Sequence, residues 1–129
     1  MAYPDDVRYT SEHEWAKLEN GLVTVGITSY ATDQLGDVVF VELPDVGRKL
    51  ESGKAFGVVE AVKTVSDLFA PVAGEVVEVN GALTDNPAIV NQEPFGEGWM
   101  IRLRPSDPAA FQKLLSHTDY EKLIEEQHA

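Results

Sequence analysis

The chain of 129 residues contains no cysteine. Disulfide bonds, thiolate nucleophiles and thiolate metal ligands are therefore excluded, and any sulfur chemistry would have to arrive on a cofactor. No stretch of apolar residues is long enough to span a bilayer. The first residues also lack the basic and apolar segment of a secretory signal, which predicts a cytoplasmic protein.

Positive charge is scarce as well. Ten Lys and Arg residues stand against 22 Asp and Glu residues, and the formal net charge is −12. A surface this acidic repels nucleic-acid phosphates and anionic membranes, so we expect neither as a partner. It favours basic clefts on other proteins instead. The length suits one domain over residues 1–129, and without a heptad repeat we expect a monomer.

Enzyme motifs are also missing. The chain has no Gly-x-Ser-x-Gly elbow and no glycine-rich loop with the spacing of a phosphate site. His13-Glu14 suggests metal or acid–base chemistry, but Lys17 stands where a zinc motif would need a second histidine. The remaining histidines, His117 and His128, lie in the tail. We therefore expect no metal and no catalytic residues, and this favours a carrier or binding module over an enzyme.

The sequence is organised around two apolar runs that meet at Lys63. Residues 56–62 and 65–72 are rich in Val and Phe and are bounded by Gly and Pro. Such short runs predict strands, so residues 55–70 are interpreted as a hairpin with Lys63 at or beside its tip. A lysine at a hairpin tip is either a solubility residue or an acylated lysine that carries a cofactor.

A short pattern occurs once on each side of this hairpin. Residues 36–43 and 74–81 both begin with Gly, an acid, and two Val residues, and the offset is 38 positions (74 − 36). Two copies indicate a mainly β fold, a flattened barrel or sandwich of two similar halves. The hairpin of Lys63 would link the halves.

The other elements expected in the barrel follow from the same signals. Residues 12–17 and 22–27 predict a second hairpin, and the apolar run 38–43 predicts a strand covered on both faces. A short helix is expected over 29–35, capped by Thr28 or Ser29 and ended by Gly36. Residues 83–91 are expected to be loop-rich, and 99–104 to form the last strand.

The tail at about 107–127 changes to a helical pattern. Asp107-Pro108 predicts a helix start, with Phe111, Leu114 and Leu115 on one face. The segment 118–121 has the pattern of a capping box, which predicts a second short helix. We expect these helices to cover one end of the sheet.

With these features in place, the chain resembles the H proteins of the glycine cleavage system. The likeness covers residues 9 to about 125. It is carried by His13-Glu14-Trp15, Gly26-Ile27-Thr28, Leu35 to Pro44, Gly47, Gly57, Glu60 to Lys63, Ser66-Asp67, Ala70-Pro71, Gly74-Glu75-Val76, Glu78-Val79-Asn80, Asn91, Pro94-Phe95 and Gly98-Trp99-Met100.

The resemblance implies a barrel-sandwich hybrid with a lipoyl group in amide linkage to Lys63. It implies a carrier that takes the aminomethyl group of glycine from a PLP-dependent glycine decarboxylase (P protein). A tetrahydrofolate-dependent aminomethyltransferase (T protein) would take over the one-carbon unit, and a dihydrolipoyl dehydrogenase (L protein) would reoxidise the carrier. In this scheme the cofactor supplies the chemistry and the protein is not itself an enzyme.

The resemblance also implies roles for residues around Lys63. By position, Glu14 and Asp67 match the acids that dock the loaded arm, with Glu12 nearby, where some members have a small hydroxyl residue. The aminomethyl cargo is a cation, for which carboxylates are suitable partners. Gly57 and Glu60 are the candidates for recognition by lipoate-attaching enzymes, although Gly57 also fits a bulge or close backbone packing.

Four other functions remain open from the sequence. The chain could be the lipoyl domain of a 2-oxoacid dehydrogenase complex, although those domains are shorter and usually have Asp before the lysine. Biotin carriers usually flank the lysine with Met, whereas Val62 and Thr64 stand here. A donor of lipoyl or octanoyl groups would share Lys63 without needing the acidic cleft. An interaction domain would never be acylated at all.

Overall fold

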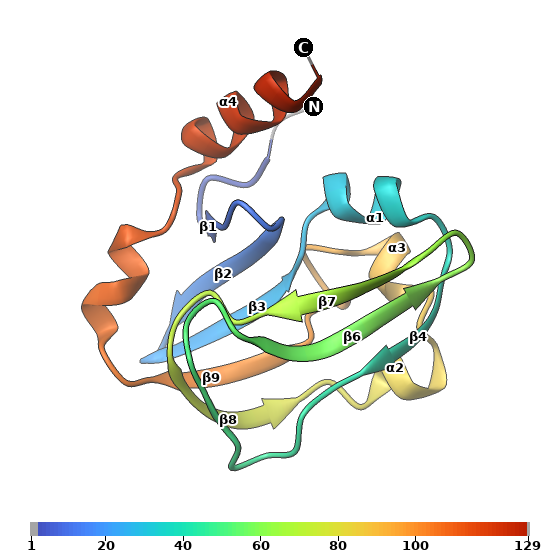
Figure 1. Cartoon of the computed structure of the whole chain (residues 1–129). Coiled ribbons are helices and arrows are strands. Elements are labelled where there is room, and N and C mark those ends of the chain that lie inside the picture. Colours follow the sequence, from blue (N-terminus) through green and yellow to red (C-terminus); the bar gives the residue numbers. More distant parts are fainter. Residues whose placement is uncertain (1–2, 129) are drawn as a thin grey trace.

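The computed structural model describes residues 3–128, and its strands form two antiparallel sheets (Figure 1). The larger sheet has six strands, and the smaller has three. Across the larger sheet the order is β1 (Arg8–Tyr9), β2 (Glu14–Glu19), β3 (Leu22–Ile27), β9 (Ile101–Pro105), β8 (Gly74–Val79) and β5 (Lys49–Leu50). Across the smaller sheet it is β4 (Val38–Glu42), β6 (Ala55–Ala61) and β7 (Val65–Phe69).

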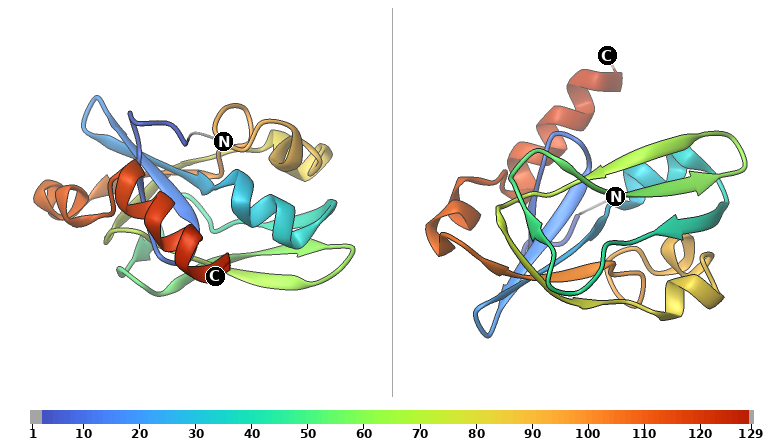
Figure 2. Two further views of the ribbon diagram at one scale, coloured as in Figure 1. Left: turned by 90° about the horizontal axis from the view of Figure 1, so that it is seen from above. Right: turned by 60° about the horizontal axis from the view of Figure 1, so that its bottom comes forward.

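The core lies between the two sheets. Val59 and Leu68 of the smaller sheet belong to the same buried cluster as Val25, Ile101 and Leu103 of the larger sheet. Strands β8 and β9 bury alternate side chains there, whereas β3 is buried along nearly its whole length. Figure 2 shows the layers from two further directions. The prediction of a mainly β barrel-sandwich fold is confirmed.

The internal repeat extends to an irregularity of the backbone. The pairing of β4 with β6 shifts register between Val38 and Phe40, and the pairing of β8 with β9 shifts between Val76 and Glu78. These two places are separated by the same 38 residues as the sequence repeat (76 − 38). A bulge adds a residue to one strand and bends it, so the two copies bend at the same point.

The expectation that residues 38–43 form a strand covered on both faces is wrong. Val39 is 53% exposed and Phe40 is 50% exposed. The smaller sheet is an outer layer with only one face on the core. Phe40 pairs with Glu60, and Glu60 pairs with Val65, so these three exposed side chains form a row across its outer face.

The predicted hairpin over 55–70 is present as β6 and β7, with Lys63 in the turn between them. The Ala61 N–H donates to the Thr64 carbonyl at 2.8 Å and closes the turn. The Val62 N–H donates to the Asp37 carbonyl at 2.9 Å and ties the tip to the start of β4. The lysine is therefore presented on an anchored turn.

The helix predicted over 29–35 is confirmed as α1 (Ser29–Leu35). The Thr28 hydroxyl accepts from the Ala31 N–H, and Gly36 ends the helix with a φ of 80°. The loop expected over 83–91 instead contains two short helices, α2 (Ala82–Asp85) and α3 (Ile89–Gln92). Each helix has one fully buried anchor, Leu83 or Val90, which the loop prediction did not consider.

The tail is helical, but its details differ from the prediction. Asp107 caps a 3₁₀ helix, η1 (Pro108–Lys113), and the chain then extends so that Leu115 pairs with Tyr9. Leu114 and Leu115 are therefore not on a helix. The last helix, α4 (His117–His128), begins before the expected capping box, because the Ser116 hydroxyl accepts from the Asp119 N–H at 3.2 Å. None of the helices within residues 3–128 is long and apolar enough to cross a membrane.

A second, aromatic cluster joins α4 to β1 and β2. Tyr9 and Tyr120 are fully buried, and their rings stack at 4.5 Å between centroids. Tyr3 packs edge-on against both rings, and Trp15 and Phe95 complete the cluster. Aromatic rings bury large apolar areas, so this cluster fixes the tail against the larger sheet.

Candidate functional site

Lys63 is exposed at the hairpin tip, and its stem lies over the end of α1. A Cβ added to Gly36 would come within 3.3 Å of the Lys63 Cδ. Glycine at position 36 therefore serves two purposes, since it adopts the positive φ that ends α1 and leaves space for the lysine stem. In Figure 1, α1 lies beside the hairpin that carries Lys63.

A cleft of about 230 Å³ runs between α1 and the hairpin, and we call it the α1–β7 cleft. Leu35, the last residue of α1, lines it, so the cleft opens close to Gly36 and the Lys63 stem. One side is made by α1, the other by β6 and β7, and the turn between β1 and β2 closes the far end. Its lining residues are Glu12, His13, Glu14, Ile27, Tyr30, Ala31, Gln34, Leu35, Val59, Ser66, Asp67 and Leu68.

The α1–β7 cleft brings together the three carboxylates predicted to dock the arm. Glu12 and Glu14 come from the turn before β2 and the start of that strand, and Asp67 comes from β7. Glu12 and Asp67 are exposed, whereas the Glu14 residue is only 2% exposed. Apolar side chains such as Ile27 and Leu68 line much of the rest, beside the polar His13, Gln34 and Ser66. The cleft therefore suits a hydrocarbon arm with a positively charged end.

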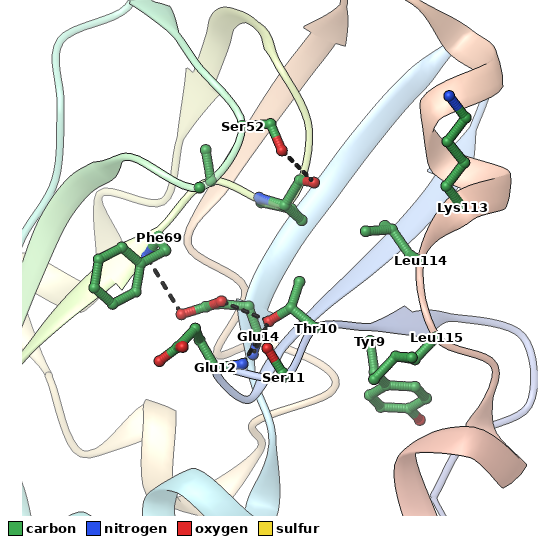
Figure 3. Close-up of a pocket in the computed structure, with 13 residues that line it drawn as sticks. Tyr9, Thr10, Ser11, Glu12, Glu14, Ser52, Phe69, Lys113, Leu114 and Leu115 are labelled. Atoms are coloured by element: carbon green, nitrogen blue, oxygen red, sulfur yellow. Dashed lines mark hydrogen bonds between the residues drawn. The ribbon is translucent and has the colours of Figure 1, made fainter. Parts of the chain in front are cut away.

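Glu14 is held by two hydrogen bonds. The Thr10 hydroxyl donates to its Oε1 at 2.7 Å, and the Phe69 N–H donates to its Oε2 at 3.3 Å. Burial raises the pKa of the Glu14 carboxyl to about 7, although both hydrogen bonds oppose the shift. Figure 3 shows the carboxylate between Thr10 and the backbone of Phe69. A cation at this end of the cleft would lower that pKa again and ionise the group.

A larger cleft of about 460 Å³ lies on the other side of the same turn (Figure 3). It shares Glu12 and Glu14 with the α1–β7 cleft. The rest of its border is made by residues 9–11, the loop before β6, and the ends of β7 and η1 with the chain just after them, including Phe69 and Lys113. No residue of the hairpin tip lines it. Of these two clefts, the smaller one is therefore bordered by both the helix under Lys63 and the three predicted acids.

The two residues predicted to guide lipoate attachment lie outside the cleft. Glu60 is exposed on the outer face of β6, three residues before Lys63. Gly57 lies at a register shift of the hairpin, where a Cβ would clash with the Glu42 carbonyl oxygen. Close backbone packing alone explains glycine at position 57, as one of the two sequence interpretations proposed.

Sequence reasoning missed the part that His13 takes in the cleft. It considered His13 only as a metal or acid–base candidate, and residues 3–128 hold no cluster of three or more metal-ligating side chains. The imidazole instead lies against the Tyr30 ring at 4.6 Å, and its Nδ1 is 2.8 Å from the Tyr120 hydroxyl. Burial lowers the pKa of His13. Tyr30 and Gln34 were also missed, although their spacing of four places them on one face of α1.

Known proteins are similar to this chain over nearly its whole length. The family model described as "Glycine cleavage H-protein" matches residues 7–127. A glycine cleavage system H protein of Thermus thermophilus is 56% identical over 125 residues, which are 97% of this chain and 98% of the relative. One of Bacteroides fragilis is 52% identical over 124 residues, which are 96% and 98% of the two chains.

A solved structure agrees with these sequence matches. The crystal structure of a glycine cleavage system H protein from Mycobacterium marinum superposes with a TM-score of 0.86 at 41% sequence identity. The match covers 98% of this chain and 100% of that one. The likeness thus extends from the sequence to the arrangement of both sheets and the tail.

Proposed function

Because this chain belongs to the glycine cleavage H-protein family, the lipoyl carriers of the glycine cleavage system, we propose that Lys63 is the residue that bears the lipoyl group. The observation that carries the proposal is the place of Lys63, exposed on an anchored turn with its stem over Gly36, which follows Leu35 of the acidic cleft in the chain. A primary amine on a flexible stem suits amide formation with a carboxylic acid cofactor.

The proposed cargo is the aminomethyl group of glycine, received from glycine decarboxylase and passed to the tetrahydrofolate-dependent aminomethyltransferase. Bound lipoate supplies a disulfide that accepts the group and is left as a dithiol for dihydrolipoyl dehydrogenase to reoxidise. The chain itself presents the arm and shelters the cargo, and it performs no catalysis. Its net charge of −12 supports docking on basic surfaces of these enzymes.

The α1–β7 cleft is proposed to hold the loaded arm between visits to the enzymes. The apolar lining accepts the hydrocarbon part, and Glu14 and Asp67 face the ammonium end, with Glu12 adding negative charge. Docking excludes bulk water from the cargo, which would otherwise hydrolyse. Arrival of the cation favours the ionised form of Glu14, whose pKa is about 7 without a partner, so the docked cargo faces a carboxylate and a proton is released to solvent.

Asp67→Asn is expected to shorten the lifetime of the cargo on the protein. The lipoylated protein is loaded with glycine and glycine decarboxylase, isolated, and followed by its release of ammonia. Asp67 is exposed, so loss of its charge should speed release by about two- to fivefold, the effect of an exposed ion pair.

The matched control is Asp33→Asn, which makes the same change on α1 at an exposed position that does not line the cleft. Its release rate should equal that of the wild type. Equal rates in both variants would show that Asp67 does not hold the cargo. Failure of the wild-type protein to take up any aminomethyl mass would remove the proposed function altogether.

Glu60→Gln is expected to slow attachment of lipoate. Glu60 lies on the strand that leads to Lys63, and its carboxylate is exposed for contact with a basic site of the attaching enzyme. We expect an increase in KM of about fivefold, from loss of one charge pair at an interface rim. Glu42→Gln is the control, since Glu42 is exposed on the neighbouring strand β4. Equal kinetics in the two variants would contradict a specific role for Glu60.

A further inference from the structure

The hydroxyl of Tyr120 joins three distant parts of the chain. It lies 2.8 Å from the His13 Nδ1 and 2.7 Å from the Thr28 Oγ1. Tyr120 and Thr28 are fully buried, and Tyr120 is separated from these partners by 107 and 92 residues. Buried polar atoms need their hydrogen bonds, so the chain Thr28–Tyr120–His13 is costly to break.

Both hydrogen-bond partners of the Tyr120 hydroxyl are connected to the α1–β7 cleft: His13 lines it, and Thr28 caps the helix that forms one of its sides. Thr28 caps α1, whose residues form one side of the cleft. His13 lines the far end, and its carbonyl accepts from the Thr28 N–H at 3.0 Å. The Tyr120 hydroxyl therefore connects the side formed by α1 to the end formed by the β1–β2 turn.

His13 also has an unusual backbone. Its φ is 72°, a left-handed conformation that is uncommon for residues other than glycine, although His adopts it more often than most, as Asn and Asp do. Glu12 and Glu14 flank it in the chain, so the direction of this turn decides where both carboxylates point. The bond from Tyr120 fixes the imidazole and supports the strained turn from outside.

We propose that Tyr120 is a positioning residue for the lipoyl arm, acting through His13 and Thr28 to hold the two sides of the α1–β7 cleft in register. The inference rests on the proposed docking of the arm in that cleft. It gives α4 a part in the carrier function, although no residue of α4 lines the cleft. The ring of Tyr120 stabilises the fold, and the hydroxyl orients Glu12, His13 and Glu14.

Tyr9 provides a matched control for this division of roles. Its ring stacks on Tyr120 with an interplanar angle of 4°, and it is equally buried. Its hydroxyl, however, donates to the Pro4 carbonyl at 2.6 Å and reaches neither His13 nor Thr28. Tyr9→Phe and Tyr120→Phe each remove one bonded hydroxyl from the same ring pair, and only the second affects the cleft.

The first measurement uses the unlipoylated proteins. The ring nitrogens of His13 are followed by NMR in wild type, Tyr120→Phe and Tyr9→Phe, together with their melting temperatures. We expect a changed His13 nitrogen signal only in Tyr120→Phe, and a lower melting temperature for Tyr120→Phe than for Tyr9→Phe, since the first loses two hydrogen bonds and the second loses one. An unchanged His13 signal in Tyr120→Phe would overturn the proposal without reference to any cofactor.

The second measurement uses the lipoylated proteins loaded with the aminomethyl cargo. Tyr120→Phe loses the bonds to both His13 and Thr28 and should release ammonia at least about fivefold faster than wild type, the effect expected from one of these bonds alone, while Tyr9→Phe should match wild type. His13→Asn, which tolerates the positive φ, should resemble Tyr120→Phe, and the double variant should be no worse than His13→Asn alone.

Three results would contradict the proposal. Equal release from Tyr120→Phe and Tyr9→Phe would overturn the positioning role and leave the docking cleft in place. Release from the wild type as fast as from a small-molecule dihydrolipoamide adduct would overturn the docking and the positioning role together. Additive effects of the His13 and Tyr120 changes would also count against it, since the two residues would then act independently.

Discussion

Lys63→Arg is expected to leave the protein with no lipoyl adduct and no carrier activity. A guanidinium stays protonated and cannot act as the nucleophile in amide formation, whereas a lysine amine can. Arginine keeps the charge and approximate length, and the side chain is exposed, so the fold should be unaffected. Intact mass of protein from cells supplied with lipoate measures the adduct, and transfer of aminomethyl cargo measures the activity.

Lys54→Arg is the control for this experiment. Lys54 is exposed just before β6, at the base of the hairpin whose tip carries Lys63. Its replacement should leave lipoylation intact. An adduct that persists in Lys63→Arg would place the cofactor on another of the six lysines. A biotinyl adduct on the wild type would indicate the other carrier class. A bare wild type, with an attaching enzyme active on a control domain, would favour an unmodified interaction domain.

Glu14→Gln is expected to stabilise the unlipoylated protein, increasingly so as pH rises from 5 to 8. Burial raises the pKa of Glu14 from 4.5 to about 7. A carboxyl with a raised pKa binds its proton more tightly in the folded state, so folding stability falls as pH rises between the unfolded and folded values. Above pH 7 the buried charge costs about 3 kcal/mol, at about 1.4 kcal/mol for each pKa unit.

The glutamine removes that cost and keeps one of the two contacts. Its amide oxygen accepts from the Phe69 N–H. The Thr10 hydroxyl oxygen already accepts from the Glu12 and Glu14 N–H groups, so it cannot also accept from the amide nitrogen, and the loss of this contact adds a cost that does not depend on pH. Urea unfolding at pH 5 and pH 8 measures the difference in free energy of unfolding, which should grow by up to about 3 kcal/mol. Glu12→Gln, an exposed neighbour, should change stability little at either pH. A difference for Glu14→Gln that does not change with pH would show that Glu14 is ionised throughout.

Local patterns predicted the parts of the fold that depend on neighbouring residues. The two short apolar runs around Lys63 predict the hairpin, and Thr28 and Gly36 predict the ends of α1, because short apolar runs and helix caps are local signals. The exposure of Val39 and Phe40 could not be predicted, because the local pattern does not show that one face of their sheet lies on the surface of the protein. The start of α4 at His117 was missed because two hydroxyl residues, Ser116 and Thr118, both offer a cap.

The candidate site also has residues that the sequence predicted and residues that it did not. Lys63, Glu14 and Asp67 were identified through the family resemblance, and the structure places the two acids in one cleft that opens near the Lys63 stem. The contribution of Tyr120 could not be found by pattern, because its partners lie about a hundred residues earlier in the chain. The left-handed backbone of His13 was not predicted either, because the conformation is uncommon for any residue other than glycine, even for histidine, which is enriched in it.

The position of the Lys63 stem over Gly36 has a kinetic consequence. An arm attached there is tethered beside its own cleft, and it meets the cleft at an effective concentration in the millimolar range that does not change on dilution. Weak intrinsic affinity is then enough to keep the arm docked for much of the time. Each proposed partner enzyme would then compete with an intramolecular site. The rate at which cargo is handed over would depend on how often the arm leaves the cleft.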